Sequence, residues 1–513
     1  MIEYNKKEIL DILKEVDNLI SSAKHLEEQN AQTLNLIHPE NINSACNLLH
    51  YIAIRAKDFR QLQKSLSSLG ISSIGHSESH TLGNLMKVKR LLLSIIGEES
   101  KDVEVELISQ KNSNHYIKNN SATLFGKTAF DGQSKIMVTL PTEASTNYKL
   151  VYELVKNGMH VARINTAHDK KTDWKKMIDH IKKASKETGK NVRIYMDLEG
   201  PKIRTGAIKS LKNKVVKGKL KSPSILLFSG SRILLTKGKK ADDTQGRISV
   251  QLSLKEIFGQ IKPNESIWFD DGQLGGKIIS ANNKEIEVEI THAPEEGFKL
   301  KSEKGINFPD SEININPLTK EDLENLKFIA KHADLVGFSF VQKPEEITIL
   351  QDLLTGLKRE DISIILKIET KLAFENFPNL LFSALRFKNC GVMIARGDLA
   401  VEVGYNRIAE LQEEILWFSE AAHVPVIWAT QVLESQIKRG IATRAEISDV
   451  VKAVRAECVM LNKGPFIIDA LKTIKDIDMR MAAHEDKKRK INRSLEVAMK
   501  FVDASVKKHA AGK

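Results

Sequence analysis

The spacing of hydrophobic residues divides the chain near residue 131. Before about residue 97, apolar residues such as Ile9, Ile12 and Val16 recur every three or four positions, which is the spacing of helices that bury one face. Because no strict heptad persists, we expect a small all-helical N-terminal extension over residues 1–97 rather than a coiled coil. Residues 98–130 are polar and rich in Ser, Asn and Lys, which predicts a linker.

From residue 131 onward, short β-rich runs alternate with amphipathic helical stretches. Eight such strand-then-helix units predict an α/β fold, a (β/α)8 TIM barrel. We place this barrel at residues 131–206 and 300–480. The eight runs are 135–140, 160–166, 192–198, 335–341, 363–369, 391–397, 424–430 and 457–462.

One interval interrupts this rhythm after the third run. Residues 207–299 lack a long helical pattern, and polar and apolar residues alternate there, as in Glu285-Ile-Glu-Val-Glu-Ile, with turn signals at Asp271-Gly272 and Asn282-Asn283. Such alternation predicts an inserted antiparallel β domain. Because the insert follows a barrel strand, we expect it to lie over the barrel mouth as a lid.

Composition narrows the class of protein without selecting a function. The 513 residues are 41% hydrophobic and 28% charged, with a net charge of +12, which excludes a largely disordered or fibrous chain. No apolar run is long enough to span a membrane, the first residues carry no apolar signal region, and the three cysteines are far apart. We therefore expect a cytoplasmic protein. The basic tail at 481–513 is interpreted as a solvated helix face.

The barrel prediction also locates the candidate chemistry, because catalytic groups of such barrels lie at the carboxyl ends of the strands. Polar or charged residues interrupt the apolar runs at those ends. They are Arg163, Asn165, Asp197, Ser339, Lys367, Glu369, Arg396, Asp398, Thr430 and Asn462. Carboxylate oxygens of Glu369 and Asp398, completed by substrate and water, suit Mg²⁺ or Mn²⁺. The alternative is a pair of buried carboxylates satisfied by Arg396 and the backbone.

Two basic residues indicate the charge of the substrate. Lys367 precedes Glu369 by two residues, so the two-residue period of a strand places both on the inner face of the barrel. A lysine beside a divalent cation requires an anion between them, such as a phosphoryl or carboxylate group. Arg163 adds a cation that can fork onto phosphate oxygens. The simpler alternative is that Lys367 pairs with Glu369 alone.

The order and spacing of eight segments resemble the pyruvate kinase family. The resemblance covers residues 131 to about 480 and includes the inserted lid. The segments are Met159-His-Val-Ala-Arg-Ile-Asn, Gly200-Pro-Lys-Ile-Arg-Thr-Gly206, Trp268-Phe-Asp-Asp-Gly272, Gly305-Ile-Asn-Phe-Pro309, Lys367-Ile-Glu369, Ala395-Arg-Gly-Asp-Leu399, Ala429-Thr-Gln-Val-Leu-Glu-Ser435 and Thr443-Arg-Ala-Glu446.

This resemblance implies phosphoryl transfer from phosphoenolpyruvate to ADP, giving pyruvate and ATP in glycolysis. Glu369 and Asp398 then match the ligands of Mg²⁺ or Mn²⁺. Lys367 matches the lysine that neutralises the phosphoryl group in transfer, and Arg163 matches an arginine between the two phosphates. Positioning and charge neutralisation are what phosphoryl transfer requires of a protein.

The resemblance also implies contacts to the rest of both substrates. Backbone N–H groups of Gly397 and Asp398 would bind the substrate carboxylate, with Ser339 also in the substrate site. Thr430 would lie near the methylene of the enolate. Asn165, His168 and Arg204 match residues that contact nucleotide phosphates.

Three positions depart from the family pattern around a monovalent cation. The family commonly binds this cation with asparagine, serine, aspartate and threonine, but here the serine is Ala167 and the threonine is Leu198. Lys202 stands where potassium-dependent members carry glutamate, and its ammonium group can replace K⁺ as a fixed point charge. The chain thus resembles the potassium-independent subgroup, and we expect that K⁺ is not required.

Other departures concern the proton donor and regulation. Asn462 stands where the family often has a serine implicated in a proton relay, and an amide is not an acid. Either water or Thr430 would then supply the proton to the enolate, or this step would be slow. Glu199 stands where many members carry lysine. We expect no C-terminal effector domain, and the helical extension resembles one found in some bacterial members. The expected partners are phosphoenolpyruvate, ADP and a second copy bound through barrel faces, without nucleic acid or membrane.

Two other classes of function stay open on the sequence alone. One is a metal-dependent lyase or aldolase acting on pyruvate or phosphoenolpyruvate, which would not need the lid or the phosphate-facing Arg163 and Arg204. The other is a non-catalytic relative that binds nucleotide or sugar phosphate through the helical extension, which the changes at Ala167, Glu199 and Asn462 keep open.

Overall fold

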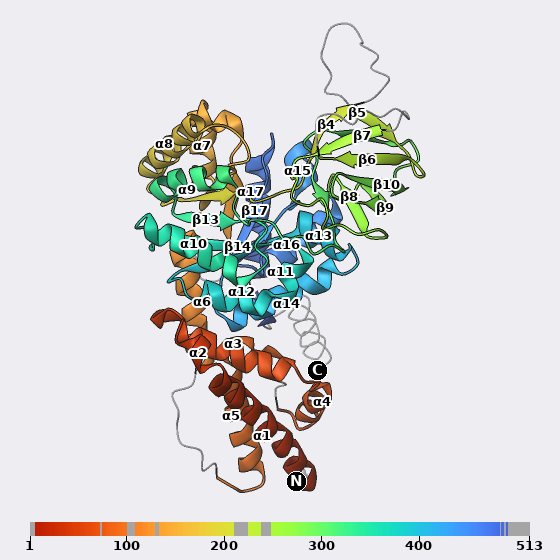
Figure 1. Cartoon of the computed structure of the whole chain (residues 1–513). Coiled ribbons are helices and arrows are strands. Elements are labelled where there is room, and N and C mark those ends of the chain that lie inside the picture. The colour runs from red at the N-terminus through yellow and green to blue at the C-terminus, as the bar shows by residue number, and fades with distance from the viewer. Residues whose placement is uncertain are drawn as a thin grey trace, which may run out of the picture.

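The computed structural model describes residues 6–71, 74–99, 108–128, 133–209, 224–237, 248–482, 484–486 and 489–490. The helical extension lies at one end of the molecule, the barrel in the middle, and the inserted sheet beside the opposite end of the barrel (Figure 1). No described helix is both long enough and apolar enough to cross a membrane.

Eight parallel strands close into a barrel, in the order β1-β17-β16-β15-β14-β13-β3-β2. This result confirms the predicted fold class, and each of the eight predicted runs overlaps one barrel strand. The strands are β1 (Lys135–Thr139), β2 (Val161–Ile164), β3 (Arg193–Leu198), β13 (Leu335–Phe338), β14 (Ser363–Ile368), β15 (Cys390–Ala395), β16 (Val426–Ala429) and β17 (Cys458–Leu461).

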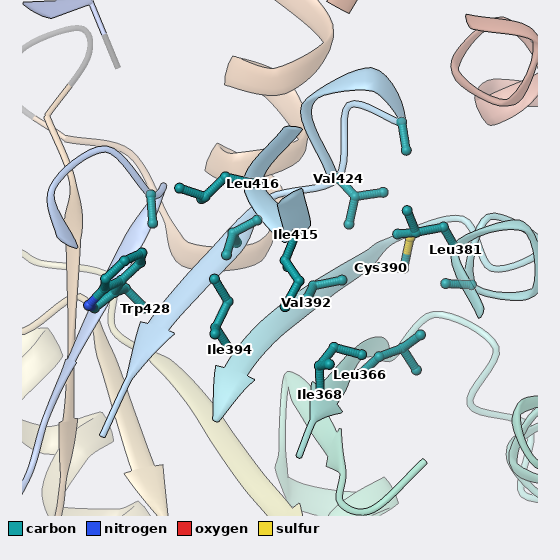
Figure 2. Packing of buried hydrophobic residues seen from close by; sticks show 14 of the residues in the cluster. Leu366, Ile368, Leu381, Cys390, Val392, Ile394, Ile415, Leu416, Val424 and Trp428 are labelled. Carbon is teal, nitrogen blue, oxygen red and sulfur yellow. The ribbon is translucent and has the colours of Figure 1, made fainter. Parts of the chain in front are cut away.

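Helices cover the outside of the barrel because alternate residues of each strand point outward. Leu366 and Ile368 of β14 and Ile394 of β15 lie on this outer side and share one apolar core with Ile415 of α14 (Figure 2). Lys367 lies between the first two and points inward, as the two-residue period requires. The helices after the strands are α7 (Tyr148–Lys156), α8 (Lys171–Thr188), α9 (Lys320–His332), α10 (Pro344–Gly356), α11 (Lys371–Glu375), α12 (Phe377–Ala384), α13 (Arg396–Val403), α14 (Ile408–Ala421), α15 (Glu434–Arg439), α16 (Arg444–Ala453) and α17 (Ile467–Met481), with a 3₁₀ turn at Thr142–Ser145.

The segment predicted as a linker contains a helix that packs against the barrel. Helix α6 (Gln110–Phe125) begins after Ser109, whose side chain accepts a hydrogen bond from the backbone N–H of Asn112 at 3.2 Å. Its last residues, Leu124 and Phe125, are buried in one cluster with inward-facing strand residues such as Met137. The linker expectation was therefore wrong for this stretch. Mostly polar residues obscured the helix, because only its C-terminal end is apolar.

The extension consists of α1 (Lys6–Gln29), α2 (Ala31–Leu34), α3 (Ile42–Arg55), α4 (Arg60–Ser68) and α5 (Thr81–Ile95), with 3₁₀ turns at Pro39–Asn41, Ile74–His76 and Glu78–His80. Polar side chains of α3 and the preceding turn fix it to the barrel. Asn41 donates to the carbonyl oxygen of Phe387 at 2.8 Å, and Asn47 donates to that of Ala421 at 2.8 Å. Ser44 lies 2.9 Å from the ring of the fully buried His423. These contacts fix the start of α3 against the barrel.

The insert forms a seven-stranded sheet in the order β12-β8-β9-β10-β6-β7-β4 and a two-stranded sheet of β11 and β5. Alternate residues of β10 are buried, including Ile286, Val288 and Ile290, and the turn at Asn282-Asn283 joins β9 to β10. Pairing is antiparallel except between β6 and β7, which are parallel. The strands are β4 (Thr205–Lys209), β5 (Ser224–Leu227), β6 (Arg232–Thr236), β7 (Ile248–Leu252), β8 (Ser266–Phe269), β9 (Leu274–Ala281), β10 (Glu285–His292), β11 (Phe298–Lys301) and β12 (Ile306–Asn307).

The insert and the chain end differ slightly from expectation. The strands of the insert run from Thr205 to Asn307, a few residues beyond the predicted limits of 207–299. After α17, the two-residue strands β18 (Glu485–Asp486) and β19 (Arg489–Lys490) pair with each other. The helical tail expected over 481–513 is therefore not helical at 485–486 and 489–490, and residues 491–513 lie outside the described part of the chain.

Candidate active site

A buried ion pair lies at the carboxyl ends of β2 and β3. Arg163 donates from Nε to Oδ2 of Asp197 at 2.7 Å, and its Nη2 lies 2.6 Å from the same oxygen. Its Nη1 donates to the hydroxyl of Thr139 at 3.0 Å. Burial alone would raise the pKa of Asp197, but the charges of Arg163 and Lys367 hold it below its ordinary value. Asp197 therefore holds the Nε–Nη2 edge of the guanidinium at the carboxyl ends of the strands.

Lys367 lies beside this pair, at the end of β14. Its ammonium group donates to the hydroxyl of Ser339 at 2.6 Å and lies 3.1 Å from Oε1 of Glu369 and 3.8 Å from Oδ1 of Asp197. Only 8% of the residue is exposed. The simpler alternative of a pair with Glu369 alone is therefore incomplete, because two carboxylates and a hydroxyl surround this lysine.

Glu369 directly follows β14 and is 3% exposed. Its Oε2 accepts a hydrogen bond of 2.7 Å from the backbone N–H of Phe340, a residue with a left-handed φ of 55°. Burial and the charge of Asp398 raise the pKa of Glu369, against the opposing effect of Lys367. A carboxylate with a raised pKa in a buried place gains most from a cation that neutralises it.

Asp398 lies in the first turn of α13, directly after β15, and not at the strand end itself. Both of its oxygens accept hydrogen bonds of 2.9 Å from the ammonium group of Lys202. This ammonium also lies 5.7 Å from the ring centroid of Phe340. Burial would lower the pKa of Lys202, but Asp398 and the more distant Glu369 raise it. A cavity of about 200 Å³ adjoins the pair, between the barrel and the chain that returns from the insert.

The two carboxylates fit a hard divalent cation by their chemistry. Glu369 and Asp398 supply oxygen ligands, and the charge of Asp398 contributes to the raised pKa of Glu369. Among the described residues no group of three or more His, Cys, Asp or Glu side chains is placed to hold a metal ion. Two protein carboxylates completed by substrate and water are the arrangement in which Mg²⁺ is usually bound.

Arg396 does not neutralise these carboxylates, so the alternative that it satisfies them is wrong. Its Nη1 lies 2.7 Å from Oδ1 of Asp449, and its Nη2 donates to Oδ2 at 2.9 Å. The same guanidinium donates to the carbonyl oxygens of Ala429 at 2.9 Å and Thr430 at 2.5 Å. Arg396 therefore ties the loop after β16 to α16.

The loop held by Arg396 is conformationally strained. Thr430, Gln431 and Leu433 have φ values of 71°, 57° and 51°, which cost side-chain-bearing residues energy. Thr430 lies directly against Gly397, because a Cβ atom at Gly397 would approach the Thr430 methyl group to 3.0 Å. The structure thus brings Thr430 next to Gly397, the residue before Asp398.

The three residues expected at the nucleotide are less clearly grouped. The side chain of Asn165 accepts a hydrogen bond from the backbone N–H of Ala167 at 3.2 Å. Burial, followed by the charge of Lys463, lowers the pKa of His168. Arg204 is bound to Glu199 through a 2.7 Å ion pair, so the departure at Glu199 gives this arginine a partner within the chain.

Sequence reasoning missed several residues that support the site. Tyr195 is fully buried beneath Asp197 and donates a short hydrogen bond to it; the two-residue period on β3 could have revealed this. Asn307 of β12 donates to Glu402 of α13 at 2.9 Å, which links the insert to the helix of Asp398. No local sequence signal indicates that contact.

Comparisons with known proteins agree with this geometry. The family model described as "Pyruvate kinase, barrel domain" matches residues 132–465. Relatives named pyruvate kinase include those of Staphylococcus saprophyticus, 31% identical over 70% of this chain, and Clostridium perfringens, 32% identical over 67%. A third, from Dictyostelium discoideum, is 32% identical over 64%. The chain spans 58%, 69% and 62% of these three relatives, respectively.

Proposed function

The chain belongs to the pyruvate kinase family, and we propose that it catalyses phosphoryl transfer from phosphoenolpyruvate to ADP in glycolysis, giving pyruvate and ATP. One observation carries this proposal. A buried lysine, Lys367, lies within 3.8 Å of Asp197 and Glu369, beside the Arg163–Asp197 pair. The cationic groups of Lys367 and Arg163, held at the carboxyl ends of the barrel strands, suit a substrate of high negative charge. A lyase or aldolase would not account for the match over the barrel and the insert together.

The proposed roles follow from position. Lys367 neutralises the phosphoryl group in transfer, and Arg163 directs its guanidinium at the phosphates of both substrates. Ser339, which accepts from Lys367, orients that lysine within the substrate site. The substrate carboxylate binds the backbone N–H groups of Gly397 and Asp398 at the start of α13, where a helix N-terminus favours an anion.

The reaction breaks the bond between phosphorus and the enol oxygen and forms a bond from phosphorus to a β-phosphate oxygen of ADP. The enolate left behind takes a proton at its methylene carbon. Thr430 is proposed to lie at that carbon and to deliver the proton directly or through water. Asn462 does not replace it, because its amide donates to Glu434 at 3.2 Å and is not an acid.

Glu369 and Asp398 are the proposed ligands of Mg²⁺ or Mn²⁺, which when bound supplies positive charge to the phosphoryl oxygens. Asn165, His168 and Arg204 are proposed to contact the phosphates of ADP. Lys202 is proposed to serve in place of K⁺, since its ammonium already lies in the acidic part of the site.

The same proposal includes the organisation and setting of the protein. We propose domains at 1–97, a barrel at 131–204 with 308–480, and a lid at 205–307 that contains strands β4 to β12, in a cytoplasmic enzyme that associates with a second copy through barrel faces. Neither nucleic acid nor a membrane is a proposed partner.

The test is pyruvate formation from phosphoenolpyruvate and Mg²⁺, with and without ADP, in the native protein and in Lys367→Met. We expect turnover that requires ADP and falls at least about 10²–10³-fold in the variant, as for loss of a group that stabilises transition-state charge. The matched control is Lys327→Met, an exposed lysine of α9 that lies 2.8 Å from Glu324 and outside the cavity beside Asp398. Turnover without ADP, or equal activity of Lys367→Met and the control, would refute the proposal.

A further inference from the structure

A cavity lies between the extension and the barrel. Its volume is about 890 Å³, within the range of sites for small organic molecules. Helices α3 and α4 and the turn at Ile74–His76 line one wall, and α14 and the C-terminal turn of α16 line the other. The extension meets the barrel at the end away from the insert (Figure 1), so this cavity is separate from the candidate active site.

The cavity carries an excess of positive charge. Arg55, Lys57 and Arg60 approach from the extension, and Lys452 and Arg455 approach from the barrel. The carboxylates among the lining residues are Asp58, Glu78 and Glu413. Cations on two opposing walls favour a ligand with more than one anionic group.

Part of this charge is not balanced by a carboxylate partner. Glu413 is shared between Arg455 at 2.7 Å and Lys452 at 3.4 Å. Within the described residues, neither Arg55 nor Lys57 forms an ion pair. Lys57 instead donates to the hydroxyl of Ser22 at 2.5 Å, which leaves its charge available to an anion.

Aromatic and aliphatic side chains also line the cavity. Arg55 lies 5.0 Å from the ring centroid of Trp417 and 5.6 Å from that of Tyr51. Phe59 and Val451 also line the cavity. An inorganic anion would leave these surfaces in contact with water, whereas an organic phosphate would cover them with its carbon skeleton.

We propose that this cavity binds a small organic phosphate, with its anionic groups between the cations of α3–α4 and those of α16. Arginine binds phosphate oxygens through paired hydrogen bonds, and Arg55 and Arg455 stand on opposite walls for this purpose. The aromatic wall around Trp417 receives the organic part.

The position of α16 connects this site to the candidate active site. Its last turn meets the cavity, while Asp449 on the same helix holds Arg396, which binds the loop of Thr430. A ligand on Lys452 and Arg455 is therefore expected to change the apparent KM for phosphoenolpyruvate. This consequence alone depends on the proposed function.

The binding test uses isothermal titration calorimetry on the full chain without Mg²⁺, with AMP and inorganic pyrophosphate as probes. The variant is Lys57→Ala combined with Arg60→Ala, because both residues are exposed and the fold should persist, as circular dichroism will show. The matched control is Lys64→Ala, an exposed cation of α4 outside the cavity lining. We expect AMP to bind more tightly than pyrophosphate and at least tenfold more weakly to the double variant than to native protein or control.

Equal AMP affinity of native protein and double variant, or no AMP binding to native protein, overturns the proposed site. Tighter binding of pyrophosphate than AMP overturns the role of the aromatic wall. Kinetics with and without AMP then test the link through α16, with the double variant expected to match native activity in the absence of AMP. Binding of AMP that leaves KM unchanged refutes the link, and a native protein without turnover refutes the proposed function while the binding result stands.

Discussion

Replacing Lys202 by glutamine tests whether a fixed ammonium group serves in place of K⁺. Lys202 donates to both oxygens of Asp398 at 2.9 Å, with side-chain exposures of 20% and 15% for the two residues. Two unit charges about 4 Å apart interact by about 4 kcal/mol at an effective dielectric constant near 20. Partial exposure reduces this, so we expect a loss of about 3 kcal/mol, or roughly 10²-fold in kcat/KM.

The assay is ADP-dependent pyruvate formation in tetramethylammonium chloride and in KCl at equal ionic strength. The native protein should show similar rates in both salts. Lys202→Gln should be slow in both, because Leu198 and Ala167 offer no side-chain oxygen to a K⁺ ion. The control is Lys327→Gln, which removes an exposed lysine 2.8 Å from Glu324 and should leave the rate unchanged.

Two results would refute this reasoning. A native rate that rises more than about tenfold in KCl would show that Lys202 does not replace the monovalent cation. A Lys202→Gln rate close to that of the control would show that its charge is not used at all. Rescue of the variant by KCl would mean that backbone or water oxygens are sufficient to hold the ion.

Three further predictions concern stability and pH. Arg396→Lys loses the two-pronged contact with Asp449 and should lower the free energy of unfolding by about 2–3 kcal/mol in urea titrations. Burial raises the pKa of Glu402 from 4.5 to about 7. The protonated side chain therefore stabilises the fold fully below the unfolded pKa, and this contribution is lost as pH rises through about 7. Glu402→Gln should reduce the fall in unfolding free energy between about pH 5 and pH 8, by up to about 3 kcal/mol. Phe125→Ala opens a cavity at the fully buried end of α6 and should cost about 3–5 kcal/mol, whereas Phe228→Ala, at a residue 44% exposed, should cost much less.

Matched controls make these three outcomes decisive. Arg407→Lys alters an exposed pair with Glu410 at 3.2 Å, and a loss equal to that of Arg396→Lys would contradict the role given to the buried contact. Glu360→Gln changes an exposed glutamate, so it should preserve the native pH profile; a profile unchanged in Glu402→Gln would be inconsistent with a raised pKa. Equal stability of Phe125→Ala and Phe228→Ala would show that the packing of Phe125 against the barrel strands does not stabilise the fold.

The residues of the candidate site illustrate how far sequence reasoning extends. Lys367 and Glu369 could be assigned to the inner face because a strand alternates its side chains, and Ser339 and Asp197 follow from the same rule on neighbouring strands. Asp398 was expected at a strand end but lies in the first turn of α13, since element boundaries depend on backbone hydrogen bonds that the residue pattern does not fix.

Local periodicity determined the parts of this protein that repeat along the chain: eight strands with outward apolar residues, their inward polar ends, and the alternating strands of the insert. Tertiary structure alone decided which charges meet. Lys202 and Asp398 are 196 residues apart, and Arg396 and Asp449 are 53 residues apart. The packing of Leu124 and Phe125 of α6 against the barrel strands likewise joins segments that are far apart in the sequence. The same holds for the cavity between the extension and α16. Periodicity reports only which face of an element is apolar, whereas such contacts depend on how complete elements pack together.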